Sequence, residues 1–116
     1  MKPEMFLQCE FSKWLDSKTI LFCASAGGMR TNIRTAVNMK RAWYKKGFPD
    51  IFIYHKNNQY AGLAIEIKVK NRPTSEQLEW QKALVNNGYK AVIMPKGMDF
   101  SQSFNYLRDL VEKYLI

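Results

Sequence analysis

The segments Gly47-Phe48-Pro49-Asp50 and Leu63-Ala64-Ile65-Glu66-Ile67-Lys68-Val69-Lys70 decide which fold and which chemistry this sequence specifies. In the second segment, large apolar residues alternate with Ala64, Glu66, Lys68 and Lys70, which is the period-two pattern of a strand with one buried face. Glu66 and Lys68 therefore project from the same side, roughly 6.5–7 Å apart. We expect a strand over residues 60–70 that carries a carboxylate and an ammonium together.

Asp50 and Glu66 are candidate ligands for a divalent cation. Mg²⁺ prefers oxygen ligands and retains several waters, so one or two carboxylates and a carbonyl are sufficient. An ammonium beside them, such as that of Lys68, can orient or help deprotonate a water that attacks a phosphodiester. A surface strand that merely carries a Glu and a Lys is the alternative interpretation, because exposed charged residues are common.

Five segments follow one another in a distinctive order: Ala26 to Arg30, Gly47 to Tyr54, Ala64 to Lys68, Ser75 to Trp80, and Gly88 to Ile93. In order and approximate spacing, from about Glu10 to Ile93, they resemble the virus-type replication-repair nuclease (VRR-NUC) family of the PD-(D/E)xK nucleases. The resemblance implies a restriction-endonuclease-like α/β core, with a central mixed sheet flanked by helices, in a single domain over residues 1–116.

The resemblance also implies roles for residues of the segments 47–50 and 63–70. Asp50, Glu66 and the backbone carbonyl of Ile67 would bind Mg²⁺ or Mn²⁺, and Lys68 would be catalytic. Such an enzyme hydrolyses phosphodiester bonds. These roles are carried over position by position onto this sequence and do not follow from the alternation pattern alone.

Two further residues have weaker assignments. Gln77 matches the glutamine that the family places near the site, but Thr74 and Gln77 also fit a capping box, which alone would account for the residue. The family has an acidic residue on its first helix that approaches the metals. Glu10 is the candidate, and no local motif distinguishes it from Glu4 or Asp16, or a metal ligand from a solvated carboxylate.

Positive charge is unevenly distributed along the chain. The sequence has 18 Lys and Arg against 10 Asp and Glu, a formal net charge of +8, and residues 17–49 contain no acidic residue. Such a field attracts a polyanion, and phosphate contacts dominate affinity for nucleic acid. A solvated basic helix or a patch for anionic lipid is the alternative. The candidate contacts to nucleic acid are Arg30, Arg34, Lys40, Arg41, Lys45, Lys46 and Lys70.

Several classes of function are excluded by the sequence. No apolar run approaches the roughly 18 residues of a membrane span, and the first residues lack the apolar core of a signal peptide, so we expect a cytoplasmic protein without membrane contact. Cys9 and Cys23 lack the spacing of a zinc site or disulfide framework. His55 is the only histidine and belongs to a polar loop, which argues against Ser-His-Asp or Cys-His catalysis.

Periodicity and turn signals predict the remaining elements. The second helix should bury Ile33, Val37 and Tyr44, and the last helix should face inward with Leu107, Leu110, Val111, Tyr114 and Leu115. The predicted elements are a helix over 4–17, a strand over 19–24, a basic helix over 30–46, a hairpin of strands over 50–55 and 60–70, a helix over 75–87, a strand over 89–94 and a helix over 101–114.

The resemblance to stand-alone members of the family implies a Mg²⁺- or Mn²⁺-dependent endonuclease that cuts branched DNA such as four-way (Holliday) junctions. Symmetric cleavage needs two sites, so a homodimer is expected, with Trp43, Tyr44, Phe48 or Phe104 as candidate interface anchors. A non-catalytic nucleic-acid-binding module on the same fold and a sequence-specific restriction-type endonuclease are the alternatives.

Overall fold

The computed structural model describes residues 1–25 and 32–116 of the chain. Helices and strands follow one another in the order that the sequence predicts, including the helix after the first strand and the helix at the end. The elements are α1 (Pro3–Ser17), β1 (Phe22–Ala24), α2 (Ile33–Arg41), β2 (Ile51–Ile53), β3 (Leu63–Glu66), α3 (Ser75–Asn86), β4 (Lys90–Ile93) and α4 (Phe100–Tyr114).

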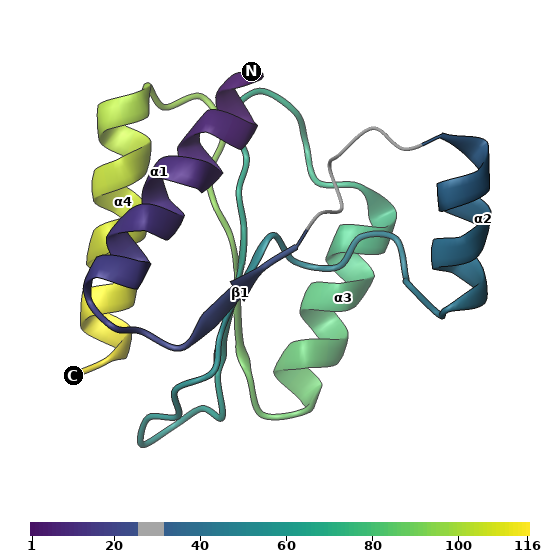
Figure 1. Ribbon diagram of the computed structural model, residues 1–116. Coiled ribbons are helices and arrows are strands. Elements are labelled where there is room, and N and C mark those ends of the chain that lie inside the picture. Colours follow the sequence, from purple (N-terminus) through teal and green to yellow (C-terminus); the bar gives the residue numbers. More distant parts are fainter. Residues whose placement is uncertain (26–31) are drawn as a thin grey trace.

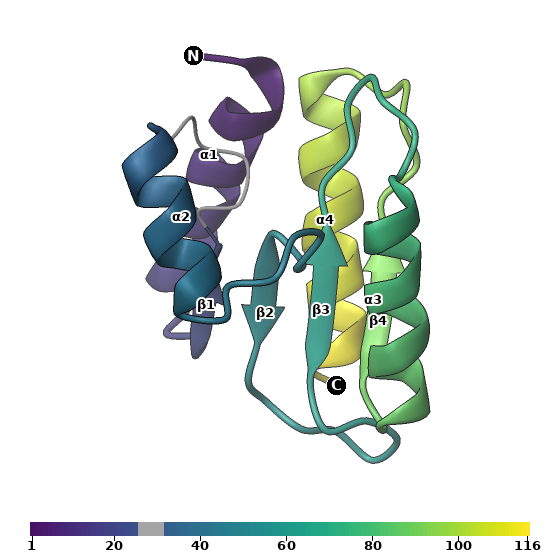
Figure 2. The same cartoon turned by 90° about the vertical axis from the view of Figure 1, so that its right-hand side faces the viewer.

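The four strands form one mixed sheet in the order β1-β2-β3-β4. β2 runs antiparallel to both β1 and β3, and β3 runs parallel to β4 (Figure 2). The predicted hairpin of β2 and β3 is confirmed, with Ile51 opposite Ile65 and Ile53 opposite Leu63. Parallel strands require a crossover connection, and α3 supplies it between β3 and β4.

Helices cover both faces of this sheet. α1 and α4 pack together on one face and α3 lies on the other (Figure 1). The main core joins residues of α1 and α4 to Ile51, Ile65 and Ile67, whereas a smaller core joins Phe52 and Ala64 to α3. The expectation of one buried face on the third strand is therefore wrong, because α3 shields the second face and residues 63–68 are all buried.

The strands are shorter than the sequence predicts. β3 covers Leu63–Glu66, although the apolar alternation extends over 60–70. At the end of α4, the prediction that Leu115 faces inward is wrong, because 39% of this residue is exposed. The other expected positions of α4 contribute to the core as predicted. They are Leu107, Leu110, Val111 and Tyr114.

The prediction for the second helix is wrong in its packing. α2 has no buried residue and stands away from the sheet, beyond α3 in Figure 1. Ile33 is 85% exposed, Val37 is 50% exposed and Tyr44 lies on the surface. The periodicity correctly indicates an amphipathic helix, but no element of the described chain covers its apolar side. None of the helices in residues 1–25 and 32–116 combines the length and apolar content needed to cross a membrane.

Candidate active site

The β2–β3 hairpin brings the two candidate carboxylates together. Ile51, the first residue of β2, lies opposite Ile65 of β3, so the next pair outward is Asp50 and Glu66. The register alone therefore places at one end of the hairpin two residues that are 16 positions apart in the sequence. Successive side chains alternate between faces, so Lys68 follows Glu66 on the same side.

Asp50 is fixed by backbone contacts on two sides. Its Oδ2 accepts a hydrogen bond of 2.7 Å from the N–H of Ile67, and its carbonyl accepts another of 2.7 Å from the N–H of Ser25. The side chain is thus tied to the residue after β3 and the main chain to the residue after β1. Asp50 can change neither its position nor its direction without breaking strand contacts.

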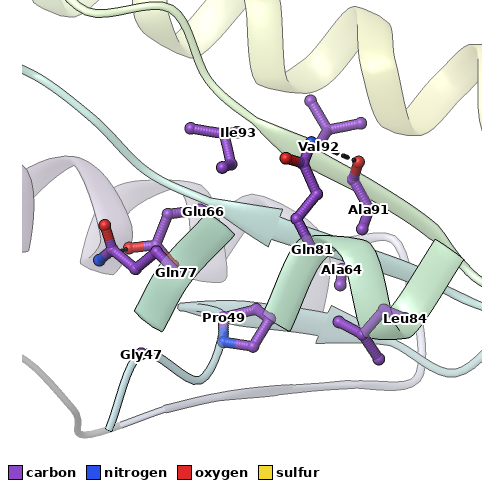
Figure 3. Close-up of a pocket in the computed structure, with 10 residues that line it drawn as sticks. All are labelled: Gly47, Pro49, Ala64, Glu66, Gln77, Gln81, Leu84, Ala91, Val92 and Ile93. Carbon is purple, nitrogen blue, oxygen red and sulfur yellow. Dashed lines mark hydrogen bonds between the residues drawn. The ribbon is translucent and has the colours of Figure 1, made fainter. Parts of the chain in front are cut away.

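Glu66 is held from the opposite side by α3. Its Oε1 accepts a hydrogen bond of 2.6 Å from Nε2 of Gln77, and Figure 3 shows Gln77 reaching from α3 to the carboxylate. The Oε1 of Gln77 meanwhile accepts 2.9 Å from the N–H of Thr74, and the Thr74 hydroxyl caps the N–H of Gln77. The sequence left open whether Gln77 caps the helix or lies near Glu66, and in the structure its side chain does both.

Lys68 is buried beside the carboxylates. Its Nζ lies 3.9 Å from Oε1 of Glu66, and only 5% of the residue is exposed. A lysine is rarely enclosed in this way without a charged partner. The interpretation of Glu66 and Lys68 as solvated residues of a surface strand is therefore excluded by their burial.

The pKa values of Asp50 and Glu66 are shifted because the two carboxyl groups are buried next to each other. Burial and, after it, the neighbouring Asp50 raise the pKa of Glu66 to about 9, although the Lys68 ammonium opposes the rise. Burial also raises the pKa of Asp50, against the effect of the Ile67 N–H. In the absence of another cation, this raised pKa leaves the Glu66 carboxyl protonated at neutral pH, because one lysine cannot stabilise two neighbouring negative charges.

The donor set fits a hard divalent cation. The buried Oε2 of Glu66 has no hydrogen-bond partner, which is costly for a carboxylate oxygen unless a cation satisfies it. Within residues 1–25 and 32–116, no three acidic, histidine or cysteine side chains form a complete metal cluster. Asp50, Glu66 and the Ile67 carbonyl are oxygen donors of the number that Mg²⁺ accepts together with water and phosphate.

The acidic residue of the first helix nearest this site is Glu4. Burial raises the pKa of Glu4, and its neighbours include the Lys68 ammonium, Asp50 and the backbone N–H of Val69. Glu10, the candidate from the sequence, instead forms an ion pair of 3.2 Å with Lys13. Six residues of helix separate the two acids by about 9 Å along the axis. The structure thus brings Glu4 and not Glu10 toward the carboxylates.

The segment before Asp50 packs against α3 and is hydrogen-bonded to it. Phe48 packs edge-to-face on Trp80 at 5.2 Å, and the Trp80 indole N–H donates 3.2 Å to the carbonyl of Lys46. Gly47 has φ +87°, and a Cβ there would lie 2.7 Å from the Cβ of Glu76. Only glycine fits this close approach, which explains why the Gly-Phe-Pro-Asp segment and the helix that contains Trp80 belong together.

The comparisons with known proteins concern this arrangement. No family model and no curated protein matches the sequence. A solved structure described as a "VRR_NUC domain protein" has 24% sequence identity to this chain and a TM-score of 0.75. The likeness covers 98% of this chain and 88% of that chain. This chain has a VRR_NUC fold.

In this VRR_NUC fold, the segments that carried the resemblance meet around one place. Residues 47–54 supply Asp50 and also Phe48, which packs on α3. Residues 64–68 supply Glu66 and Lys68, and residues 75–80 supply Gln77 and Trp80. The segment 26–30, with Arg30, lies outside the described residues. A narrow pocket between α3 and the sheet, lined by Gly47, Glu66 and Gln77, has room for about one water molecule (Figure 3).

The other residues that the sequence suggests as contacts to nucleic acid are exposed cations of this VRR_NUC fold. Three of them belong to α2, two follow α2, and one follows β3. Arg34 and Arg41 lie on one side of α2, next to the apolar side that carries Ile33 and Val37. The exposed candidates are Arg34, Lys40, Arg41, Lys45, Lys46 and Lys70.

The structure also shows the contacts of the single histidine and the state of the two cysteines. His55 accepts a hydrogen bond of 2.8 Å from the N–H of Leu21, and its carbonyl accepts 2.7 Å from the hydroxyl of Tyr114. It therefore connects the end of β2 to β1 and α4. Cys9 and Cys23 are free thiols.

Proposed function

We propose that this chain is a VRR-NUC nuclease, a divalent-metal-dependent endonuclease that hydrolyses phosphodiester bonds in DNA. The observation that supports this proposal best is the convergence of Asp50, Glu66 and the enclosed Lys68 at one end of the β2–β3 hairpin. A purely structural cluster would not retain two carboxylates of raised pKa next to each other, because their burial is costly.

In this proposal, Asp50, Glu66 and the Ile67 carbonyl hold Mg²⁺ or Mn²⁺. The cation, when bound, offsets negative charge on the phosphoryl oxygens and lowers the pKa of water. Lys68 lies within 3.9 Å of Glu66, so its ammonium can orient the attacking water and stabilise the negative charge that develops in the transition state. Gln77 keeps the Glu66 carboxylate in one direction while it does so.

Branched DNA is the proposed substrate. The net charge of +8 favours a polyanion, and the exposed cations of α2 and the segment after it lead along the chain to Asp50. A helix that stands away from the sheet suits a substrate whose arms leave the site in several directions, such as a four-way junction. We expect binding to weaken steeply with added salt, because cation contacts to phosphates release counterions.

We also propose that the nuclease acts as a homodimer. Two cuts placed symmetrically in a junction require two sites related by a two-fold axis. The apolar side of α2 with Ile33 and Val37, together with Trp43, which is 81% exposed, supplies an uncovered surface for the second copy. Two of the other candidate anchors serve packing inside the chain: Phe48 contacts Trp80, and Phe104 contacts Phe11.

The test is cleavage of a labelled four-way junction with and without Mg²⁺ or Mn²⁺. We expect metal-dependent cleavage by the wild type and a loss of at least about 100-fold in Lys68→Ala, since general acid-base groups contribute 10²–10⁴-fold. Lys13→Ala is the matched control, because Lys13 is exposed and pairs only with Glu10. It should cleave like the wild type.

Two outcomes would favour the alternatives. Tight junction binding without cleavage in any divalent metal supports a non-catalytic nucleic-acid-binding module. Cleavage of linear duplex at one recognition sequence, with no effect of a branch, supports a restriction-type endonuclease. A nuclease for branched DNA should instead cut beside the branch wherever the branch is placed.

A further inference from the structure

An apolar cavity lies between the first turns of α1 and α4. Its volume is about 150 Å³. Pro3, Phe6 and Leu7 of α1 line one side, and Met98, Phe100 and Ser103 line the other. Phe6 and Phe100 are each about half exposed and their rings lie 5.3 Å apart, so they form an aromatic rim at the surface.

Ser103 is the unexplained residue of this cavity. It is 1% exposed, and its Oγ has no hydrogen-bond partner. A buried hydroxyl without a partner is costly, and a helical serine usually donates to a carbonyl of the preceding turn. An alanine would fill the same position without that cost. The hydroxyl therefore suits a polar atom that enters the cavity from outside.

The cavity and the candidate active site lie on two sides of one short stretch of backbone. Val69 lines the cavity, and the preceding residue, Lys68, contacts Glu66. On α1, Pro3 and Phe6 line the cavity, while Glu4 lies among the charges of the site. A DNA strand that places a phosphate at the carboxylates can therefore extend to the aromatic rim.

We propose that this cavity binds one unpaired nucleobase, preferably a pyrimidine, of the DNA strand held at Asp50 and Glu66. The inference rests on the proposed function, since it names the part of the DNA that the nuclease recognises. An apolar cavity of about 150 Å³ accommodates a benzene molecule, which matches a single six-membered ring better than a purine. The exposed ring of Phe6 stacks on the base at the rim, beside Phe100, and the Ser103 hydroxyl bonds the polar edge of the base.

The test is binding of three branched DNAs that differ only at the unpaired nucleotide beside the branch, which is a thymine, an adenine or an abasic analogue. Affinity is measured by fluorescence anisotropy in Ca²⁺, another cation that prefers oxygen ligands. We expect the wild type to bind the thymine DNA about tenfold more tightly than the abasic DNA, given the usual strength of base stacking on aromatic side chains. The adenine DNA should bind more weakly than the thymine DNA.

Ser103→Leu, which fills the cavity, should bind all three DNAs with the affinity of the abasic one. Ser103→Ala is the matched control that keeps the cavity and should retain part of the preference. Phe6→Ala, at an exposed ring, tests the rim if Ser103→Leu does not fold and should reduce the preference several-fold.

Equal affinity of the wild type for the three DNAs would overturn the base-binding proposal. With metal-dependent cleavage still present, that result would leave the proposed nuclease function intact. A wild type that binds no DNA at all would overturn both. A preference that survives in both Ser103→Leu and Phe6→Ala would also overturn the assignment, because the base would then bind elsewhere.

Discussion

Gln77 donates a hydrogen bond of 2.6 Å to Glu66 from the same side chain that completes the N-terminal cap of α3. One residue thus couples the start of a helix to the most strongly perturbed carboxylate of the site. If α3 shifts along its axis, the donor leaves Glu66. The position of α3 and the direction of the carboxylate are therefore linked, and variants of Thr74 and Gln77 can separate the two roles.

Gln77→Ala should lower both the stability and the cleavage rate, whereas Thr74→Ala should lower stability alone. Loss of the Thr74 cap should cost about 1 kcal/mol, since the donor to Glu66 remains. Urea unfolding and single-turnover cleavage of a junction measure the two effects. If Thr74→Ala slows cleavage as much as Gln77→Ala, the bond from Gln77 to Glu66 does not position the carboxylate.

Glu66→Gln should flatten the pH dependence of stability of the metal-free protein. Because burial raises the pKa of Glu66 from 4.5 to about 9, the folded chain retains a proton that the unfolded chain releases within this range. Stability should therefore fall as the pH rises from 4.5 toward 9. Urea midpoints across this range in a chelator measure the slope, with Glu112→Gln on the exposed side of α4 as the control. Parallel profiles for wild type and Glu66→Gln would contradict the shift.

Binding of Mn²⁺ at neutral pH should release a proton from the wild type. The proton on the Glu66 carboxyl must leave before that carboxylate can bind a cation, so metal affinity should rise with pH. Calorimetric titration in two buffers of different ionisation enthalpy measures the release. Glu66→Gln should bind more weakly and release less. Equal heats in both buffers with the wild type would contradict the release of a proton on metal binding.

Glu4→Gln should reduce cleavage, and Glu10→Gln should not. Glu4 lies among the charges of Asp50 and Lys68, whereas Glu10 pairs with Lys13 away from the site. The two substitutions are chemically identical and lie on one helix, so each controls for the other. Their single-turnover rates at saturating Mg²⁺ decide the assignment. A loss confined to Glu10→Gln would restore the residue that the sequence favoured.

Val37→Glu should convert the proposed dimer into monomers. Val37 is half exposed on the apolar side of α2, and no residue of this helix is buried, so the chain should still fold. Thr35→Glu adds the same charge on the opposite side of α2 and should leave the dimer intact. Sedimentation equilibrium distinguishes the two species. A wild type that is monomeric at every concentration, or a Val37→Glu variant that remains dimeric, would contradict the proposal.

Much of the fold could be predicted because its signals are local. The capping box at Thr74 and Gln77, the polar turn between β2 and β3, and Gly88 with φ +89° after α3 each specify a boundary without reference to distant residues. The register that pairs Asp50 with Glu66 is not specified in this way, because residues 54–62 separate β2 from β3 and a connection of this length does not fix the pairing.

The failures concern contacts between distant segments. The alternation in β3 indicates which residues share a face but not whether a helix covers the other face, as α3 does. In the same way, the helical period of α2 indicates that the helix has an apolar side, but it does not indicate which element packs against that side. The sequence also does not decide between Glu4 and Glu10, because only the packing of α1 on α4 and β1 determines which end of α1 meets the sheet.

The isolation of α2 has a consequence for how this protein can diversify. With none of its residues in the interior, replacement of the helix leaves the free energy of unfolding of the α/β body almost unchanged. Its cations and apolar side can therefore vary while the carboxylates and Lys68 stay fixed. Under the proposed nuclease function, the DNA shapes that are recognised can be changed in this helix at little risk to the folding of the α/β body.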